Sequence, residues 1–165
     1  MAAWRLSARF LRLFGFYLPD CTHGAPVAEP APISDDERLS RYVTNEDHFN
    51  VTRNQVHFRA FLPPSKENEL SIMRTAMLSE DEVWALGTAI AKKSGRTVFA
   101  RGDFLAPHVR ESAVDQWRLT VCPDEPPVRH ALIRGWPPAV ETEIRKSLAQ
   151  QLRANAQLRV PPGHL

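Results

Sequence analysis

Histidine and arginine side chains are the groups that could do chemistry in this chain. The four histidines of the predicted domain are His48, His57, His108 and His130. They form no HExxH or HxH pair, and no Cys/His cluster has the spacing of a zinc site. The sequence also lacks a phosphate loop, a GxSxG nucleophile elbow and a GxGxxG dinucleotide fingerprint. We therefore expect no metal ion and no cofactor, and we assign no catalytic residue.

Three residues remain as candidates for ligand binding: His48, Arg74 and His130. In the segment ELSIMRT, the alternation of a strand places Arg74 on the same face as Leu70 and Ile72. His130 likewise shares a predicted strand face with aliphatic neighbours. A guanidinium or an imidazole on an apolar face can bind an anion such as phosphate or carboxylate.

Each candidate also has a purely structural interpretation. Arg74 can end its strand in water or pair with an internal acid. His130 can be a hydrogen-bonded histidine of the core or the sheet edge. His48 follows Asn45-Glu46-Asp47 and can belong to a packed turn. These interpretations stay open beside the functional one.

Composition indicates one domain with extensions. The chain has 165 residues, of which 43% are hydrophobic and 24% charged, and its formal net charge is +2. The positive charges are spread along the chain, so the sequence carries no strong nucleic-acid signature. Cys21 and Cys122 make neither a CxxC motif nor a disulfide framework. A reducing, cytoplasmic location is the best fit.

The first 18 residues are predicted to be an amphipathic basic extension. On a helix, Arg5, Arg9 and Arg12 share one face and apolar residues fill the other, as in helices that lie on membranes. A weak contact with a membrane surface, a leader without function and an export signal are the alternatives. No run of about 20 apolar residues predicts a transmembrane helix. Residues 19–33 are rich in proline and alanine and are predicted to be a linker.

Residues 34–158 are predicted to form one globular domain, and residues 159–165 a tail. A short first helix is expected through Leu39 and Tyr42. Ser79 and Glu82 form a capping box, which predicts a helix that ends near Gly95. A final helix is expected to follow Pro138. It would carry a stripe of Val140, Ile144, Leu148 and Leu152, while Arg145, Lys146 and Arg153 stay in solvent.

Alternating patterns predict the strands and the fold class. The expected strands are residues 54–62, 69–75, 97–101, 117–122 and 128–134, and the last two are expected to pair antiparallel. A single helical turn is expected within residues 107–112. This order predicts an α+β domain with a mostly antiparallel sheet of about five short strands and helices packed on one face.

Residues 39–137 resemble a group of small bacterial proteins of unknown function. The segments that carry the resemblance are LSRYVTNEDHF, VHFRAFLPP, ELSIMRT, LSEDEVWALG and RHALIRGWP. Such proteins combine a Ser-Arg-aromatic segment, a His-Phe pair before a proline-ended strand and a closing Gly-Trp-Pro. The resemblance implies no catalytic residues, and it favours a bacterial or phage-derived cytoplasmic protein.

Two classes of function remain open. The first is a non-enzymatic binding or interaction module of an accessory or mobile-element locus, with a protein as the expected partner. The second is a small enzyme that acts on a phosphorylated or nucleotide-like ligand through His48, Arg74 and His130. Convergence of these side chains in one concave pocket would favour the enzyme, and dispersed positions would favour the binding module.

Overall fold

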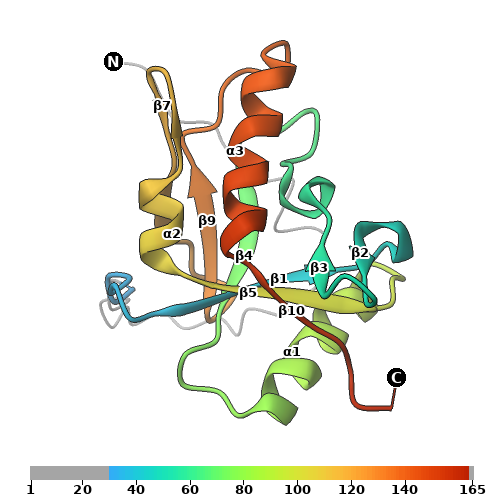
Figure 1. The fold of residues 1–165 in the computed structure, drawn as a ribbon. Coiled ribbons are helices and arrows are strands. Elements are labelled where there is room, and N and C mark those ends of the chain that lie inside the picture. The colour runs from blue at the N-terminus through green and yellow to red at the C-terminus, as the bar shows by residue number, and fades with distance from the viewer. Residues whose placement is uncertain (1–29, 164–165) are drawn as a thin grey trace.

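A six-stranded antiparallel sheet organises the chain in the computed structural model, which describes residues 30–163 (Figure 1). The strand order is β10 (Gln157–Arg159), β5 (Ala100–Leu105), β1 (Arg38–Val43), β4 (Leu70–Arg74), β9 (His130–Arg134) and β8 (Thr120–Pro123). Two hairpins lie beside the sheet, β2 (Phe49–Asn50) with β3 (Gln55–Val56) and β6 (Ala113–Val114) with β7 (Trp117–Arg118).

Helices complete the domain. The α-helices are α1 (Glu80–Lys93), α2 (Ala106–Glu111) and α3 (Thr142–Asn155), and the short 3-10 helices are η2 (Glu46–His48) and η3 (Phe58–Phe61). The predicted α+β class, the single domain and the mostly antiparallel sheet are confirmed, as is the antiparallel pair β8 and β9. Among the helices described between residues 30 and 163, none is long and apolar enough to cross a membrane.

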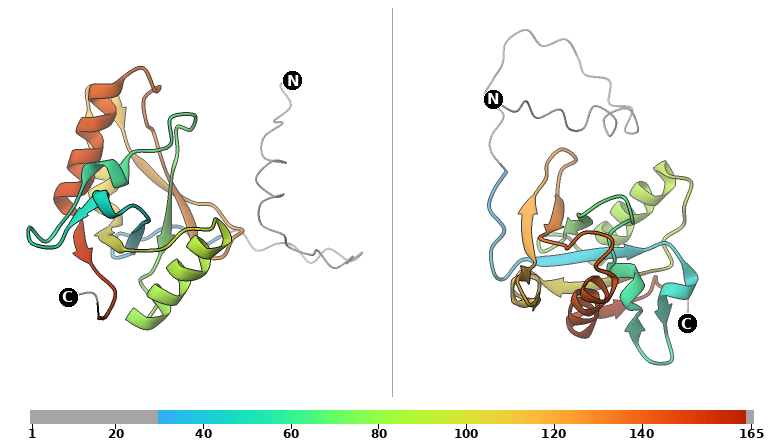
Figure 2. Two further views of the ribbon diagram at one scale, coloured as in Figure 1. Left: turned by 90° about the vertical axis from the view of Figure 1, so that its right-hand side faces the viewer. Right: turned by 90° about the horizontal axis from the view of Figure 1, so that it is seen from above.

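The two faces of the sheet differ in character because side chains alternate along each strand. Leu39 and Val43 of β1 point to an apolar face together with Phe104 of β5. The main hydrophobic core lies on this face and includes Phe61 of η3 and Leu148 of α3. In Figure 2, α2 and α3 lie on this side of the sheet and α1 lies on the other.

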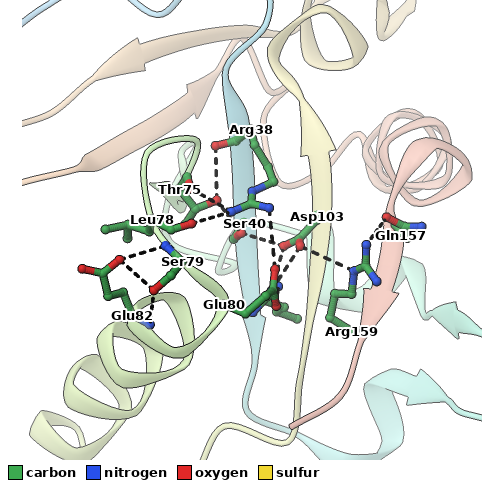
Figure 3. Close-up of polar contacts among 11 residues, drawn as sticks. Arg38, Ser40, Thr75, Leu78, Ser79, Glu80, Glu82, Asp103, Gln157 and Arg159 are labelled. Carbon is green, nitrogen blue, oxygen red and sulfur yellow. Dashed lines mark hydrogen bonds and ion pairs between the residues drawn. The ribbon is translucent and has the colours of Figure 1, made fainter. Parts of the chain in front are cut away.

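Helix α1 begins as the sequence predicts. Ser79 Oγ accepts a hydrogen bond from the Glu82 main chain, and Glu82 Oε2 accepts one from the Ser79 main chain at 2.8 Å (Figure 3). The helix approaches β1 at Gly87, where an added Cβ would lie only 2.4 Å from the Tyr42 ring. Tyr42 also donates its hydroxyl to the Val83 carbonyl at 2.6 Å. A glycine is therefore required where helix and strand meet.

The predicted helix through Leu39 and Tyr42 is wrong, because these residues belong to β1. This strand lies between β5 and β4 and is covered on both faces, so polar residues are buried with the apolar ones. Ser40 is fully buried and donates to Asp103 Oδ1 at 2.6 Å. A strand buried on both faces loses the apolar-polar alternation by which strands are recognised in a sequence.

The predicted strand over residues 54–62 is mostly wrong as well. Only Gln55–Val56 is extended, and Phe58–Phe61 forms a 3-10 helix. His57 caps that helix, since its Nδ1 accepts the Arg59 main-chain N–H at 3.2 Å. The His57 side chain thus accepts a main-chain hydrogen bond that, in a strand, would go to a neighbouring strand.

Two further boundaries differ from the prediction. Strand β5 begins at Ala100 and continues to Leu105, whereas the sequence predicts residues 97–101. Helix α3 begins at Thr142, so Val140 lies before it and is 85% exposed. Leu148 and Leu152 do form the predicted buried stripe. The helical turn predicted within residues 107–112 is present as α2.

Arg145 of α3 is buried, which corrects the expectation that it stays in solvent. Its guanidinium donates to the carbonyls of Pro63 at 3.1 Å and Pro137 at 3.2 Å, and to Asn68 Oδ1 at 3.2 Å. Burial lowers the pKa of Arg145 below its ordinary value. Arg145 thus fastens α3 to two proline-containing loops, and two of the acceptors, Pro63 and Asn68, lie too far away in the sequence to be predicted.

The ends of the domain also gain contacts. Ile33 is buried in the core, and its carbonyl accepts a hydrogen bond from Arg110 at 2.6 Å. At the other end, Arg159, placed in the predicted tail, is the last residue of β10. The predicted extension over residues 1–18 and the linker up to residue 29 lie outside the described residues.

Candidate functional site

A surface pocket of about 680 Å³ lies beside the end of β1. Its walls come from β1 and the loop that follows, from η2 and η3, and from the segment between α1 and β5. Arg41, Arg59 and Arg96 line it, and we call it the arginine pocket. Glu46 and Asp47 line it too, yet neither forms an ion pair with any of these arginines.

Arg41 is the innermost anchored cation of this pocket. Its Nε donates to the Ala60 carbonyl at 2.9 Å and its Nη1 to the Ser71 carbonyl at 2.8 Å. Burial, and then the positive charge of Arg96, lower the pKa of Arg41 to about 10. The guanidinium is therefore fixed in place and charged at neutral pH. Within residues 30–163 no carboxylate pairs with it.

His48 lines the same pocket, and His57 lies next to it. The two rings are stacked with their centroids 6.5 Å apart. Burial lowers the pKa of His48, and the charges of His57, Arg59 and Arg41 lower it further, while Asp47 opposes them. Burial, followed by the charge of Arg59, also lowers the pKa of His57. The lowered pKa values favour the neutral imidazoles, whereas an anion in the pocket would favour their protonation.

Arg74 has an internal partner. Glu37 accepts its Nε at 2.9 Å and its Nη2 at 3.0 Å, and the Ala31 carbonyl accepts its Nη1 at 2.9 Å. The hydrogen bond to Glu37 raises the pKa of Arg74 despite partial burial. Arg74 lines a second, smaller pocket of about 350 Å³ with Glu37 and Glu125. Its charge is therefore already neutralised, in agreement with the structural interpretation.

His130 forms a hydrogen-bonded chain on the face of the sheet opposite the core. Its Nε2 lies 2.6 Å from Ser71 Oγ, and its Nδ1 lies 3.0 Å from Asp124 Oδ2. Ser71 is exposed, and His130 is 12% exposed at its side chain. Sequence reasoning missed this chain. It forms because the register of β4 and β9 pairs His130 with Met73. Ser71 lies two residues before Met73, so its side chain is on the same face of the sheet as His130.

The three predicted candidates therefore do not share a pocket. His48 lines the arginine pocket, Arg74 lines the second pocket, and His130 lines neither of them. Arg41, Arg59 and Arg96 are the pocket residues that sequence reasoning missed. The sequence gives little indication that these arginines form one site, because they are far apart and no shared motif links them.

A buried polar cluster joins α1 to the sheet. Arg101 is fully buried, and its Nε donates to Asp103 at 3.0 Å and its Nη2 to Glu80 at 2.5 Å. Its guanidinium lies 4.6 Å from the centre of the Trp84 ring. Figure 3 shows Ser40, Asp103 and Glu80 together in this cluster. Arg101 of β5 contacts Glu80 and Trp84 of α1, so the cluster holds α1 on the sheet.

Neither a search for metal-binding clusters nor comparison with known proteins identifies another site among the described residues. In the part of the chain that the structure describes, no group of three or more His, Cys, Asp or Glu side chains could hold a metal ion. Comparison with protein-family models, with curated proteins and with solved structures finds no match. The geometry of the side chains is therefore the only guide to function.

Proposed function

We propose that this chain is an interaction module that binds an anionic group in the arginine pocket. The observation that carries the proposal is the set of three arginines that line one cavity without a carboxylate ion pair among the described residues. Glu46 and Asp47 also line the pocket, but the three arginines outnumber them. Arginines that form no ion pair can bind phosphate or carboxylate through charge-assisted hydrogen bonds.

The size of the pocket supports a ligand larger than bare phosphate. Its volume of about 680 Å³ lies within the range of roughly 300–1,000 Å³ that is usual for small-molecule sites. Apolar side chains complete the wall, among them Leu62 and Phe99. The ligand class is therefore a phosphate or carboxylate attached to an organic body. It is supplied either by a protein partner, the source expected from the sequence, or by a free metabolite.

The alternative of a small enzyme acting through His48, Arg74 and His130 gains no support from their positions. The three side chains lie in separate surroundings, and Arg74 is already paired with Glu37. Dispersed positions favour the binding module.

A cytoplasmic location is part of the proposal. Cys122 is a free thiol, which fits a reducing compartment. The resemblance to small bacterial proteins supports a bacterial origin in an accessory or mobile-element locus.

Isothermal titration calorimetry tests the binding proposal directly. The ligands to be tested are inorganic phosphate, a nucleoside monophosphate, citrate and a phosphoserine peptide. They distinguish phosphate from carboxylate as the anion, and a metabolite from a protein as its source. Arg59→Gln and Arg96→Gln are the preferred variants, because both side chains are exposed and their loss leaves the main-chain contacts of Arg41 intact. Arg118→Gln, an exposed arginine outside the pocket, is the matched control.

Each pocket variant should weaken binding about five- to tenfold, and the control should bind as the original protein does. If the original protein binds the phosphoserine peptide but not the nucleoside monophosphate, the ligand comes from a protein partner. Equal weakening in all three variants, or no saturable binding of any anion, contradicts the proposal.

A further inference from the structure

Ser71, His130 and Asp124 form a hydrogen-bonded chain that is separate from the arginine pocket. The chain runs from the exposed Ser71 hydroxyl on β4 to His130 on β9 and then to Asp124, which directly follows β8. The two hydrogen bonds measure 2.6 Å and 3.0 Å, within the range at which a nucleophile, its base and an orienting acid operate.

The polarity of the chain follows from its acceptors. His130 Nδ1 lies 3.1 Å from the Asp124 carbonyl and 3.0 Å from the Asp124 carboxylate, and both oxygens can only accept. The proton of the neutral ring must therefore sit on Nδ1, which leaves Nε2 as an acceptor. The Ser71 hydroxyl donates to Nε2, as a serine does when an imidazole acts as its general base.

In this hydrogen-bonded chain the serine is accessible to solvent and the histidine is held in place, as a nucleophile and its base require. Ser71 is exposed to solvent, and within residues 30–163 its Oγ hydrogen-bonds to His130 alone. His130 is mostly buried, and both of its ring nitrogens are engaged. The Asp124 carboxylate lies 3.9 Å from the Arg134 guanidinium, so it has a second partner besides His130. A fixed base thus faces a serine that a substrate can reach.

We propose that Ser71 is a nucleophile activated by His130, with activated carboxylic esters as its substrate class. In the first step a bond forms between Ser71 Oγ and the ester carbonyl carbon, while the serine proton moves to His130 Nε2. The bond from carbon to the alcohol oxygen then breaks, and that oxygen takes the proton from Nε2. Water reverses the sequence: Nε2 removes its proton, its oxygen attacks the acyl carbon, and Ser71 leaves with that proton.

The restriction to activated esters follows from what surrounds Ser71. Among the described residues His130 Nε2, an acceptor, is the only side-chain partner of Ser71 Oγ, so no side-chain donor lies there to stabilise an oxyanion. Stabilisation of the oxyanion by each such donor is worth roughly 10²–10³ in rate in hydrolases. Esters with a good leaving group, such as aryl esters, depend least on that stabilisation. This reactivity goes beyond the proposed binding function and uses residues outside the arginine pocket.

A fluorophosphonate probe followed by mass spectrometry of tryptic peptides tests the proposal. The probe reacts as the ester does: the bond from oxygen to phosphorus forms, fluoride leaves, and the serine proton passes through His130 to solvent. Trypsin releases residues 67–74, in which Ser71 is the only hydroxyl residue. In the peptide of residues 60–66 the only hydroxyl residue is Ser65, an exposed serine that serves as a reference in the same molecule.

Ser71 should be labelled at least tenfold faster than Ser65. His130→Gln should remove this difference. Asp124→Asn should reduce it less, because the main-chain carbonyl of residue 124 still accepts the Nδ1 proton. Equal labelling of Ser71 and Ser65 in the original protein overturns the proposal, and this comparison holds even if a variant fails to fold. Undiminished labelling of Ser71 in folded His130→Gln overturns it as well.

Discussion

Glu37 accepts two hydrogen bonds from the Arg74 guanidinium, at 2.9 Å from Nε and 3.0 Å from Nη2. The side chains are only 12% and 13% exposed. Because a guanidinium remains charged in a protein, an arginine on a largely buried surface needs an anion. Glu37 supplies it from the turn before β1, so Arg74 contributes to stability and is not free to bind a ligand.

Arg74→Ala should lower the free energy of unfolding by about 2 kcal/mol, because it leaves the Glu37 carboxylate largely buried without its partner. Arg134→Ala is the matched control. Arg134 pairs with Glu69 at 2.7 Å, but both side chains are nearly half exposed, so the expected loss is below about 1 kcal/mol. Urea titration measures both. Equal losses, or a phosphate-dependent rise in melting temperature that disappears in Arg74→Ala, would contradict this account.

Ser79→Ala should lower the free energy of unfolding by about 1 kcal/mol, because the Glu82 amide loses its cap and Glu82 loses an orienting hydroxyl. Ser94→Ala at the other end of α1 removes only one hydrogen bond, from Ser94 Oγ to the Ala91 carbonyl at 3.0 Å. Its effect should be smaller. A neutral result for Ser79→Ala would mean that another group caps the helix.

Features that depend on neighbours in the sequence were predictable. Ser79 and Glu82 lie three residues apart, so the start of α1 follows from local chemistry alone. Leu148 and Leu152 are likewise one helical turn apart. The alternation in ELSIMRT gave β4 to within one residue at each end.

Features that depend on distant partners were not predictable. Ser40 is a buried strand residue only because Asp103, 63 positions away, accepts its hydroxyl. Arg145 is buried because carbonyls such as that of Pro63, 82 positions away, accept hydrogen bonds from its guanidinium. The hydrogen bond between Ser71 and His130 requires the β4–β9 register, which no local pattern specifies.

Removal of residues 1–29 and removal of residues 1–33 should have different effects. The longer deletion removes Ile33, which is 8% exposed, and the Ala31 carbonyl that accepts Arg74. Loss of the buried isoleucine alone should cost about 2 kcal/mol relative to the shorter deletion. Thermal melts of the two truncated proteins provide the comparison. Coincident melting curves would show that the packed core begins after residue 33.

Stability should fall as the pH drops from 7 towards 5, through the titration of His48 and His57. Burial lowers the pKa of both in the folded state, so the unfolded chain binds more protons in this range. Protonation therefore favours unfolding, and the stability present above their unfolded pKa is lost as the pH falls.

Melting temperatures measured in buffers without phosphate test this dependence. His48→Gln should flatten it, whereas His108→Gln, which alters a histidine outside the pocket, should not. Anion affinity should change in the opposite direction and rise as the pH falls, because a protonated His48 adds a positive charge to the pocket. A stability that rises as the pH falls from 7 to 5 would contradict the assignment.

The most direct test of the arginine pocket is an NMR titration of the arginine side-chain Nε–H resonances with inorganic pyrophosphate. We expect saturable shifts with one common dissociation constant for Arg41, Arg59 and Arg96, and no saturable shift for Arg118. Small linear shifts that are equal for all four arginines would show that pyrophosphate acts only through ionic strength, and would contradict an anion site in this pocket.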